Sequence, residues 1–268
     1  MKARRRSGAT LAGMGRPPQI IAFGGGGFSM ENGNPLLDDH VLSLTGRERP
    51  RVCFIPTASG DADHYVVRFY RAFSAIAETS HVSLFRRDRG AGAVEGCLRE
   101  HLLEQDVIYV GGGSVVSLLG AWMAHGLDRI LEECWRNGTI LCGGSAGSLC
   151  WFEEAVTAFH GPPQPVRGLG FLPFSNCVHY DAEPGRRAEF HTYVAEGMIA
   201  GYAADDGCAL HFVGTTLHDV VSSKAGASAY LVQAVGGEAV ETEGRVLAHI
   251  RKCDLVADAA QRAPLARG

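Results

Sequence analysis

The sequence predicts an α/β fold with a doubly wound, mainly parallel sheet, helices on both faces and extra strands near the C-terminus. Three observations indicate it. Short apolar runs alternate with segments of helical periodicity from residue 19 to residue 151. Two of the later runs end in glycine-rich loops, at 111–113 and 143–147. Further runs with strand character fill the last third of the chain. Strands that alternate with helices form right-handed βαβ units, which build parallel sheets covered on both sides.

The elements expected before the second glycine loop can be located from their apolar residues. Strands are expected at 19–23, 51–56, 81–85, 106–110 and 139–142. Helices are expected at 36–44, 62–78, 92–104, 115–125 and 127–136. The carboxyl ends of parallel strands share one edge of the sheet, and sites in such folds lie there. Both glycine-rich loops should therefore lie close together at that edge.

The pattern is less regular after the second loop. Residues 152–165 show no clear period, and Pro162-Pro163 excludes a helix there. The elements expected beyond them are a strand at 175–180, a helix at 186–202 and strands at 208–212, 216–222, 229–235 and 246–250. We expect the late strands to extend the same sheet as antiparallel or edge strands. Since no repeat or Pro/Ser-rich linker interrupts the chain, we expect a disordered tail at 1–18 and a single domain at 19–268.

Composition excludes several classes of function. The formal net charge is −4, which provides no general attraction to nucleic acid or to an anionic membrane. No apolar stretch is long enough to span a bilayer. The eight cysteines form no C-x-x-C pair and mostly lie in apolar runs, so the sequence favours a reducing cytoplasm over a disulfide scaffold. The histidines show no H-x-x-x-H spacing, and no metal site is predicted.

The segment around Ser145 carries the main chemical signal. An apolar run ends in Gly143-Gly144-Ser145-Ala146-Gly147 and a second apolar stretch follows. This pattern is typical of a strand that turns sharply into a helix with a nucleophilic serine at the apex. The amide of Ala146 would then help to hold a developing oxyanion. The alternative is a glycine-rich turn that packs closely or holds a phosphate.

Two other stretches could contribute to the same site. His179 ends a predicted strand, where it is either the general base for Ser145 or a histidine with a structural role at a sheet edge. The run Gly24–Gly27 follows the first strand without the G-x-G-x-x-G spacing of a dinucleotide site, so we expect a flexible rim near the site.

These motifs resemble the peptidase E family of aspartyl dipeptidases. The resemblance rests on Val110–Gly113, on Gly143–Gly147, on the strand-end His179 and on the upstream sequence Phe54-Ile55-Pro56-Thr57-Ala58. The family is related to the cyanophycinases and is similar in fold to class I glutamine amidotransferases. The resemblance implies a hydrolase without a cofactor.

The resemblance also implies roles for individual residues. Ser145 would be the nucleophile, His179 the base, and the amides of Gly113 and Ala146 the oxyanion hole. Asp206 matches the family's third catalytic position, with Asp for Glu, while Asp181 and Glu183 remain competitors. At the place of the family's substrate-binding arginine stand Arg186 and Arg187, of which Arg187 matches better. Ser114 replaces an asparagine that is common at the substrate rim.

The expected function is a serine exopeptidase, a dipeptidase that releases an acidic N-terminal residue from a small peptide. One alternative is a cyanophycinase-like or other amide hydrolase on the same scaffold. A second is a catalytically silent binding protein. The expected partner is a small peptide substrate, and a homodimer is an open alternative to a monomer.

Overall fold

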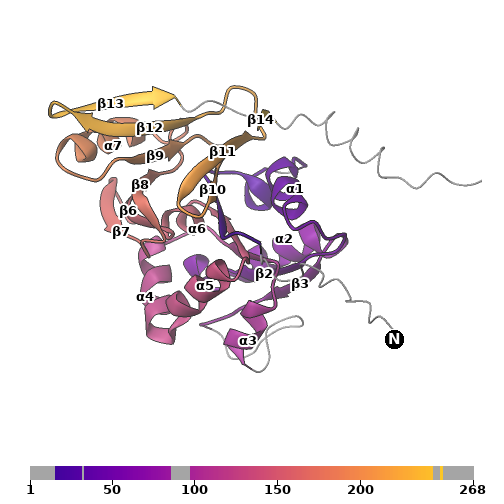
Figure 1. Cartoon of the computed structure of the whole chain (residues 1–268). Coiled ribbons are helices and arrows are strands. Elements are labelled where there is room, and N and C mark those ends of the chain that lie inside the picture. The colour runs from indigo at the N-terminus through magenta and orange to yellow at the C-terminus, as the bar shows by residue number, and fades with distance from the viewer. Residues whose placement is uncertain (1–15, 32, 86–96, 244–247, 250–268) are drawn as a thin grey trace, which may run out of the picture.

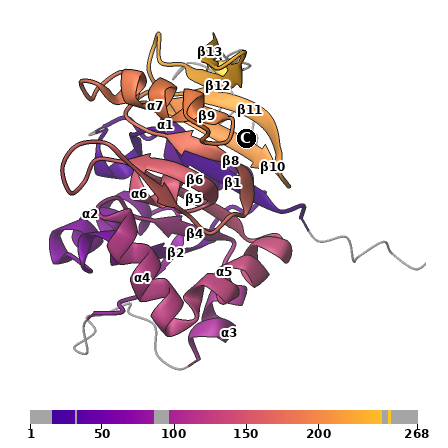
Figure 2. The ribbon, with the colours of Figure 1, turned by 90° about the vertical axis from the view of Figure 1, so that its left-hand side faces the viewer.

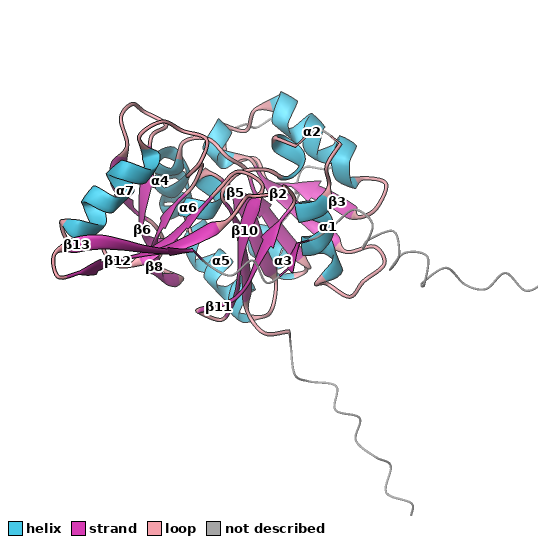
Figure 3. Ribbon diagram, turned by 90° about the horizontal axis from the view of Figure 1, so that it is seen from above, coloured by secondary structure: helices cyan, strands magenta, loops and turns pink. Residues whose placement is uncertain are grey.

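The computed structural model describes residues 16–31, 33–85, 97–243 and 248–249. Their strands form two sheets that lie side by side (Figure 3). The first sheet has the order β14-β11-β10-β1-β5-β4-β2-β3 and the second has the order β13-β12-β9-β8-β6-β7. The α/β class predicted from the sequence is confirmed.

The first sheet is parallel from β1 to β3 in the strand order, and an antiparallel strand joins it on the other side of β1. Its parallel strands are β1 (Gln19–Phe23), β2 (Arg51–Ile55), β3 (Glu78–His81), β4 (Val107–Val110) and β5 (Ile140–Gly144). β10 (Cys208–Val213) pairs antiparallel with β1, and β11 (Thr216–Ser222) pairs antiparallel with β10. The short β14 (Ala248–His249) then runs parallel to β11. Because β1, β4 and β5 run in the same direction, their carboxyl ends meet at one edge.

Helices cover both faces of the first sheet (Figure 1). Side chains on one face, such as Ile21 and Phe54, pack with α1 (Leu36–Ser43) and α2 (Asp63–Phe73). Their neighbours in the strands, such as Ile20 and Cys53, point the other way and belong to the apolar cluster that α3, α4 and α5 complete. These three helices span Leu98–Leu103, Val115–His125 and Leu127–Arg136. The alternation of side chains along a strand thus produces the two covered faces.

The second sheet differs from the single extended sheet expected from the sequence. Its strands are β6 (Phe152–Thr157), β7 (Gln164–Arg167), β8 (Leu172–Cys177), β9 (Gly201–Ala204), β12 (Ala229–Val235) and β13 (Glu238–Glu243). Only β10, β11 and β14 extend the first sheet. The helix expected at 186–202 ends earlier, as α7 (Arg186–Ala195), and the residues after it form β9. Phe190 and Val194 of α7 pack against one face of this sheet, on the side away from α3, α4 and α5 (Figure 2).

Two more of the elements expected from the sequence differ in the structure. The strand expected at 81–85 is instead β3, which ends at His81. The amides of Leu84 and Phe85 each donate to Oδ2 of Asp61 at 2.7 Å, so this apolar run leaves the sheet. The helix expected at 92–104 is described only as α3, since residues 86–96 lie outside the described residues. Residues 1–15 of the tail predicted at 1–18 and part of the predicted strand at 246–250 lie outside them too.

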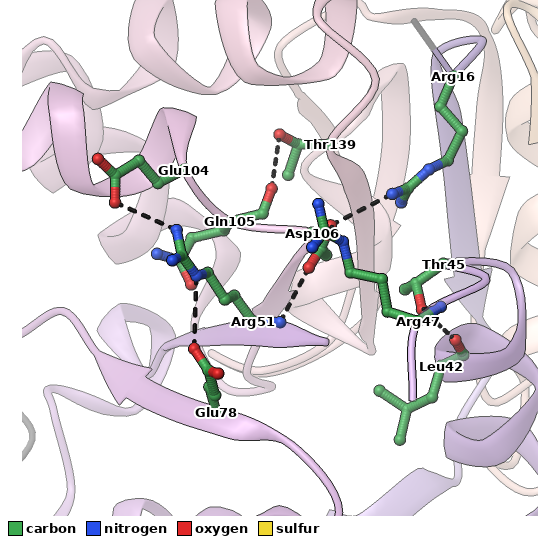
Figure 4. A network of polar contacts seen from close by, with 10 residues as sticks. All are labelled: Arg16, Leu42, Thr45, Arg47, Arg51, Glu78, Glu104, Gln105, Asp106 and Thr139. Carbon is green, nitrogen blue, oxygen red and sulfur yellow. Dashed lines mark hydrogen bonds and ion pairs between the residues drawn. The ribbon is translucent and has the colours of Figure 1, made fainter. Parts of the chain in front are cut away.

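A charged network ties the strands together at the amino end of the first sheet (Figure 4). Asp106, just before β4, accepts hydrogen bonds from the backbone amide of Arg51 at 3.0 Å and from the guanidinium of Arg16 at 3.2 Å. Arg47 pairs with the same carboxylate at 2.8 Å, and the side chain of Arg51 reaches Glu104 at 3.3 Å. This network joins the starts of β2 and β4 and leaves the carboxyl ends of the strands for the site. Among the described residues, no helix is both long and apolar enough to cross a bilayer.

Candidate active site

Ser145 lies in a sharp turn between β5 and α6 (Ala146–Leu149), as the glycine pattern predicts. Its backbone has φ 55° and ψ −119°, a conformation that a non-glycine residue rarely adopts. Gly143 and Gly147 both lie against the carbonyl of Val110, where the Cβ of any other residue would overlap with that oxygen. The two flanking glycines therefore let β5, β4 and α6 approach closely enough to hold the strained serine.

The glycine loop at 111–113 lies beside this turn. A Cβ on Gly112 would lie 3.4 Å from Cβ of Ser145, so this residue is in close contact with the serine. Gly113 has φ 136°, and a Cβ there would overlap with the carbonyl oxygen of Ala58. Gly112 and Gly113 line the same pocket as Ser145, which agrees with the sequence prediction that the two loops share one edge.

His179 reaches the site from the second sheet. It follows β8 with φ 54°, and its backbone amide donates to the carbonyl of Gly24 at 3.0 Å. Its Nδ1 lies 2.7 Å from Oδ1 of Asp206, and the two side chains are only 12% and 19% exposed. If Nδ1 carries the hydrogen and donates it to the carboxylate, Nε2 is left as the nitrogen that can accept a proton.

The three candidate acids occupy different positions. Asp206 contacts the imidazole from the turn between β9 and β10. Asp181 accepts the backbone amide of Asp206 at 2.8 Å, which makes it a support for that turn. Glu183 pairs with the guanidinium of Arg186. Of the three, only Asp206 is in position to orient His179.

The Gly24–Gly27 loop lies next to the histidine and the aspartate. Gly25 bridges to Asp206 as an isolated parallel β-pair, and its carbonyl accepts the amide of Gly207 at 2.8 Å. A Cβ on Gly25 would overlap with the Asp206 carboxylate and lie 2.9 Å from Nδ1 of His179. This glycine is therefore required by the close packing of two site residues.

A pocket of about 360 Å³ opens at Ser145. One wall consists of Ser145 and His179 with three glycines, Gly112, Gly113 and Gly144. Another wall consists of His64, Tyr65 and Arg68 of α2, and Phe159 also lines the pocket. The hydroxyl of Tyr65 accepts the amide of Gly112 at 3.1 Å and so connects the two walls.

The predicted substrate-binding residues do not line this pocket. Arg186 is 3% exposed, donates to the carbonyl of Val156 at 3.1 Å and pairs with Glu183. Arg187 pairs with Glu241 and lies over two aromatic rings, 5.2 Å from the centroid of Tyr180 and 4.8 Å from that of Tyr230. It lines a separate cavity of about 690 Å³.

Ser114 has a supporting position. Its hydroxyl accepts the amide of Ser117 at 3.1 Å, capping α4, and lies 2.7 Å from Nε2 of His160. Since Phe159 lines the pocket, Ser114 contacts the rim through the residue next to Phe159 rather than facing the pocket itself.

The comparison with protein families matches residues 20–220 to the model of peptidase family S51. The chain belongs to peptidase family S51. A relative from Bacillus subtilis, named uncharacterized peptidase YgaJ, is 48% identical over 225 residues, which cover 83% of this chain and 95% of the relative. Peptidase E from Streptomyces coelicolor is 29% identical over 163 residues, 59% of this chain and 63% of the relative. The solved structure of a peptidase from an acI-B1 Actinobacterium shares the fold with a TM-score of 0.66, at 17% identity, over 87% of this chain and 96% of that one.

Membership in family S51 makes the protein a peptidase, and the peptidase E resemblance inferred from the sequence is confirmed. The two cysteines that flank Ser145 are not suited to be the nucleophile of the site. Cys142 and Cys150 are fully buried, and burial raises the pKa of both thiols well above their ordinary value. Within the described ranges, no group of three or more His, Cys, Asp or Glu side chains is arranged to hold a metal ion.

Sequence reasoning did not identify the wall that α2 contributes to the site of this S51 peptidase. His64 and Arg68 stand four residues apart, which places them on one face of a helix. The available signal was that this helix follows a strand–loop segment at the carboxyl edge of the sheet, where ligands bind in such folds. An exposed arginine on a helix carries no such signal by itself.

Proposed function

We propose that this S51 peptidase is a serine exopeptidase that hydrolyses short peptides, in particular dipeptides with an acidic N-terminal residue, through an acyl-enzyme on Ser145. The observation that carries the proposal is the 2.7 Å contact between His179 and Asp206 at the pocket that Ser145 lines. A serine, a histidine and an oriented carboxylate are the groups that activate a hydroxyl nucleophile.

The proposed reaction has two halves. The Oγ of Ser145 attacks the peptide carbonyl while Nε2 of His179 takes its proton, and Asp206 stabilises the imidazolium that forms. The amides of Gly113 and Ala146 donate to the oxyanion. The imidazolium then protonates the leaving amine, the C–N bond breaks and the acyl-enzyme remains. Water attacks the ester with His179 again as base, which releases the acid and restores Ser145.

The pocket supports a small substrate. Its volume of about 360 Å³ lies near the lower end of the range of about 300–1,000 Å³ for small-molecule sites. The relatives named peptidase E make a dipeptide the first substrate to test. Among the described residues that line the pocket, Arg68 carries the one permanent charge, and this cation favours a substrate with a carboxylate.

The proposal includes a reducing cytoplasmic location. All seven described cysteines are free, and six of them are buried. A protein of an oxidising compartment commonly uses such residues in disulfides. We also propose a homodimer. Sedimentation velocity of the purified protein tests this assembly.

The test is labelling with a fluorophosphonate probe, followed by intact-mass measurement and by assays with dipeptides. We expect one adduct on the wild-type protein and none on Ser145→Ala, together with a loss of at least about 10⁴-fold in kcat. Labelling of Ser148→Ala at the wild-type rate is the control, because Ser148 is buried and its hydroxyl donates to Asn176 at 3.0 Å. Wild-type turnover that persists in Ser145→Ala would refute the proposal.

A further inference from the structure

Helix α2 brings a cation to the pocket of Ser145. Arg68 lines this pocket, and no aspartate or glutamate is among the described residues that do so. The other titratable groups there are His64, Tyr65 and His179. A pocket with one fixed positive charge and no carboxylate is complementary to an anion.

The charge of Arg68 is available to a ligand. Its Nη1 donates to a neutral partner, the carbonyl of Ser29, at 3.1 Å, and the side chain is exposed. No carboxylate of the described residues lies within ion-pair distance of it. Arg68 also lines the neighbouring cavity, where the described carboxylates are Glu31 and Asp38. Glu31 already accepts from Ser223 at 2.9 Å and from Asn34 at 3.1 Å, and the buried Asp38 accepts from the hydroxyl of Tyr109 at 3.0 Å.

The two arginines predicted from the sequence are in the opposite situation. Arg186 is buried with Glu183 as its partner, and Arg187 has Glu241 as its partner and two tyrosine rings beneath it. A substrate carboxylate would have to displace an existing carboxylate from either of them. Arg68 requires no such exchange.

We propose that Arg68 binds a carboxylate of the peptide substrate while the scissile carbonyl lies at Ser145. This inference rests on the proposed function, because it gives the specificity of the same site. The guanidinium fork matches a carboxylate with two parallel N–H···O bonds. The carboxylate belongs either to the acidic N-terminal side chain or to the C-terminus of the dipeptide, and the substrates below separate these sources.

The experiment compares Arg68→Met with Arg71→Met. Arg71 lies on the same helix, is exposed and lines the neighbouring cavity but not the pocket of Ser145, so its replacement removes the same charge from outside the site. We expect Arg68→Met to lower kcat/KM for Asp-Leu about 10- to 100-fold, mainly through KM, and Arg71→Met to change it less than twofold. Arg68→Lys should recover part of the loss, because it restores the charge without the fork.

Three substrates identify the carboxylate. If Arg68 binds the acidic side chain, the loss occurs with Asp-Leu and Asp-Leu-amide and is absent with Ala-Leu. If it binds the C-terminus, the loss occurs with Asp-Leu and Ala-Leu and is absent with Asp-Leu-amide. Equal losses on all three substrates, or an equal loss in Arg71→Met, would overturn the inference, as would a selective loss in Arg187→Met with Arg68→Met unaffected.

A binding measurement separates this inference from the proposed function. Calorimetric titration of Asp-Leu into Ser145→Ala, with and without Arg68→Met, requires no turnover. We expect the second change to weaken binding by the same factor that KM shows, and no difference would refute the role of Arg68. Fluorophosphonate labelling of Ser145 in Arg68→Met should proceed at the wild-type rate. Failure of that labelling in the wild type as well would contradict the serine mechanism, whereas the titration would still test Arg68.

Discussion

The two sheets supply different parts of the candidate site and are built differently. The first sheet supplies Ser145 from β5, and the strands beside it, β1 and β4, are buried along their whole length. The second sheet supplies His179, and its edge strands β7 and β13 are largely exposed. The proposed nucleophile therefore follows a strand between two fully buried neighbours, while the proposed base belongs to a sheet with exposed edges.

A few backbone hydrogen bonds join the two halves beside the site. His179, which follows β8, donates to Gly24 at 3.0 Å, and Gly207, in the turn after β9, donates to Gly25 at 2.8 Å. Both bonds run from the second sheet to the loop that follows β1 of the first sheet. From this difference we expect that changes at the junction affect the rate more than the stability, and that changes within the first sheet do the reverse.

The largest effect is expected for Asp206→Asn, at the junction. An amide can donate to Nδ1 of His179 and hold the ring in the wrong tautomer, so we expect kcat to fall about 10³- to 10⁴-fold. The matched control is Asp181→Asn, whose remaining oxygen can still accept the amide of Asp206. Steady-state kinetics and thermal melting measure both variants. Equal loss in the two would mean that Asp206 does not orient the base.

A smaller effect is expected for Gly25→Ala. The new methyl group overlaps with the Asp206 carboxylate, so the aspartate and the imidazole must shift. Displacement of this size should lower kcat about 10- to 100-fold. Gly120→Ala, in the first-sheet helix α4, is the control, since no atom lies within 4 Å of the added Cβ. It should leave kcat unchanged and raise stability by about 0.5–1 kcal/mol. A wild-type rate for Gly25→Ala would contradict the tight junction.

The smallest effect concerns His211 in β10 of the first sheet. Burial, together with the neighbouring His40 and His218, lowers the pKa of His211 to about 4. The folded state then binds fewer protons than the unfolded state, whose histidine has a pKa near 6.5, so stability should fall as pH decreases from about 6.5 toward 4. Melting curves at pH 7 and pH 5 should differ by several degrees, and His211→Asn should reduce that difference. An unchanged difference in the variant would show that other groups cause it.

The first sheet could be predicted from the sequence because its strands are apolar runs that alternate with segments of helical periodicity. Helices α4 and α5 begin and end at the predicted residues, since Ser114 caps the first and Gly126 separates them with φ 67°. The strands β7 and β13 could not be predicted, because most of their residues are exposed and no apolar alternation marks them. Their pairing depends on neighbours distant in the sequence.

Part of the candidate site could likewise be predicted from the sequence. Ser145 and Gly113 follow strands of the first sheet, and the glycines adjacent to them in the sequence indicate the loops. The choice of Asp206 over Asp181 depended on which carboxylate reaches His179, which a sequence does not contain. Arg187 was the expected carboxylate-binding residue, but its partner Glu241 stands 54 residues away in a strand that was not foreseen. The ion pair became visible only with the fold.

The backbone of the two catalytic candidates has a consequence for the protein's evolution and engineering. Ser145 and His179 both have positive φ, at 55° and 54°, although neither is a glycine. Each such conformation costs of the order of 1–3 kcal/mol, which the surrounding structure has to offset. Glycine would relieve that strain at either position and remove the chemistry. A screen that rewards only expression or heat resistance should therefore enrich inactive glycine variants, so stabilised versions of this peptidase have to be selected with turnover as a second criterion.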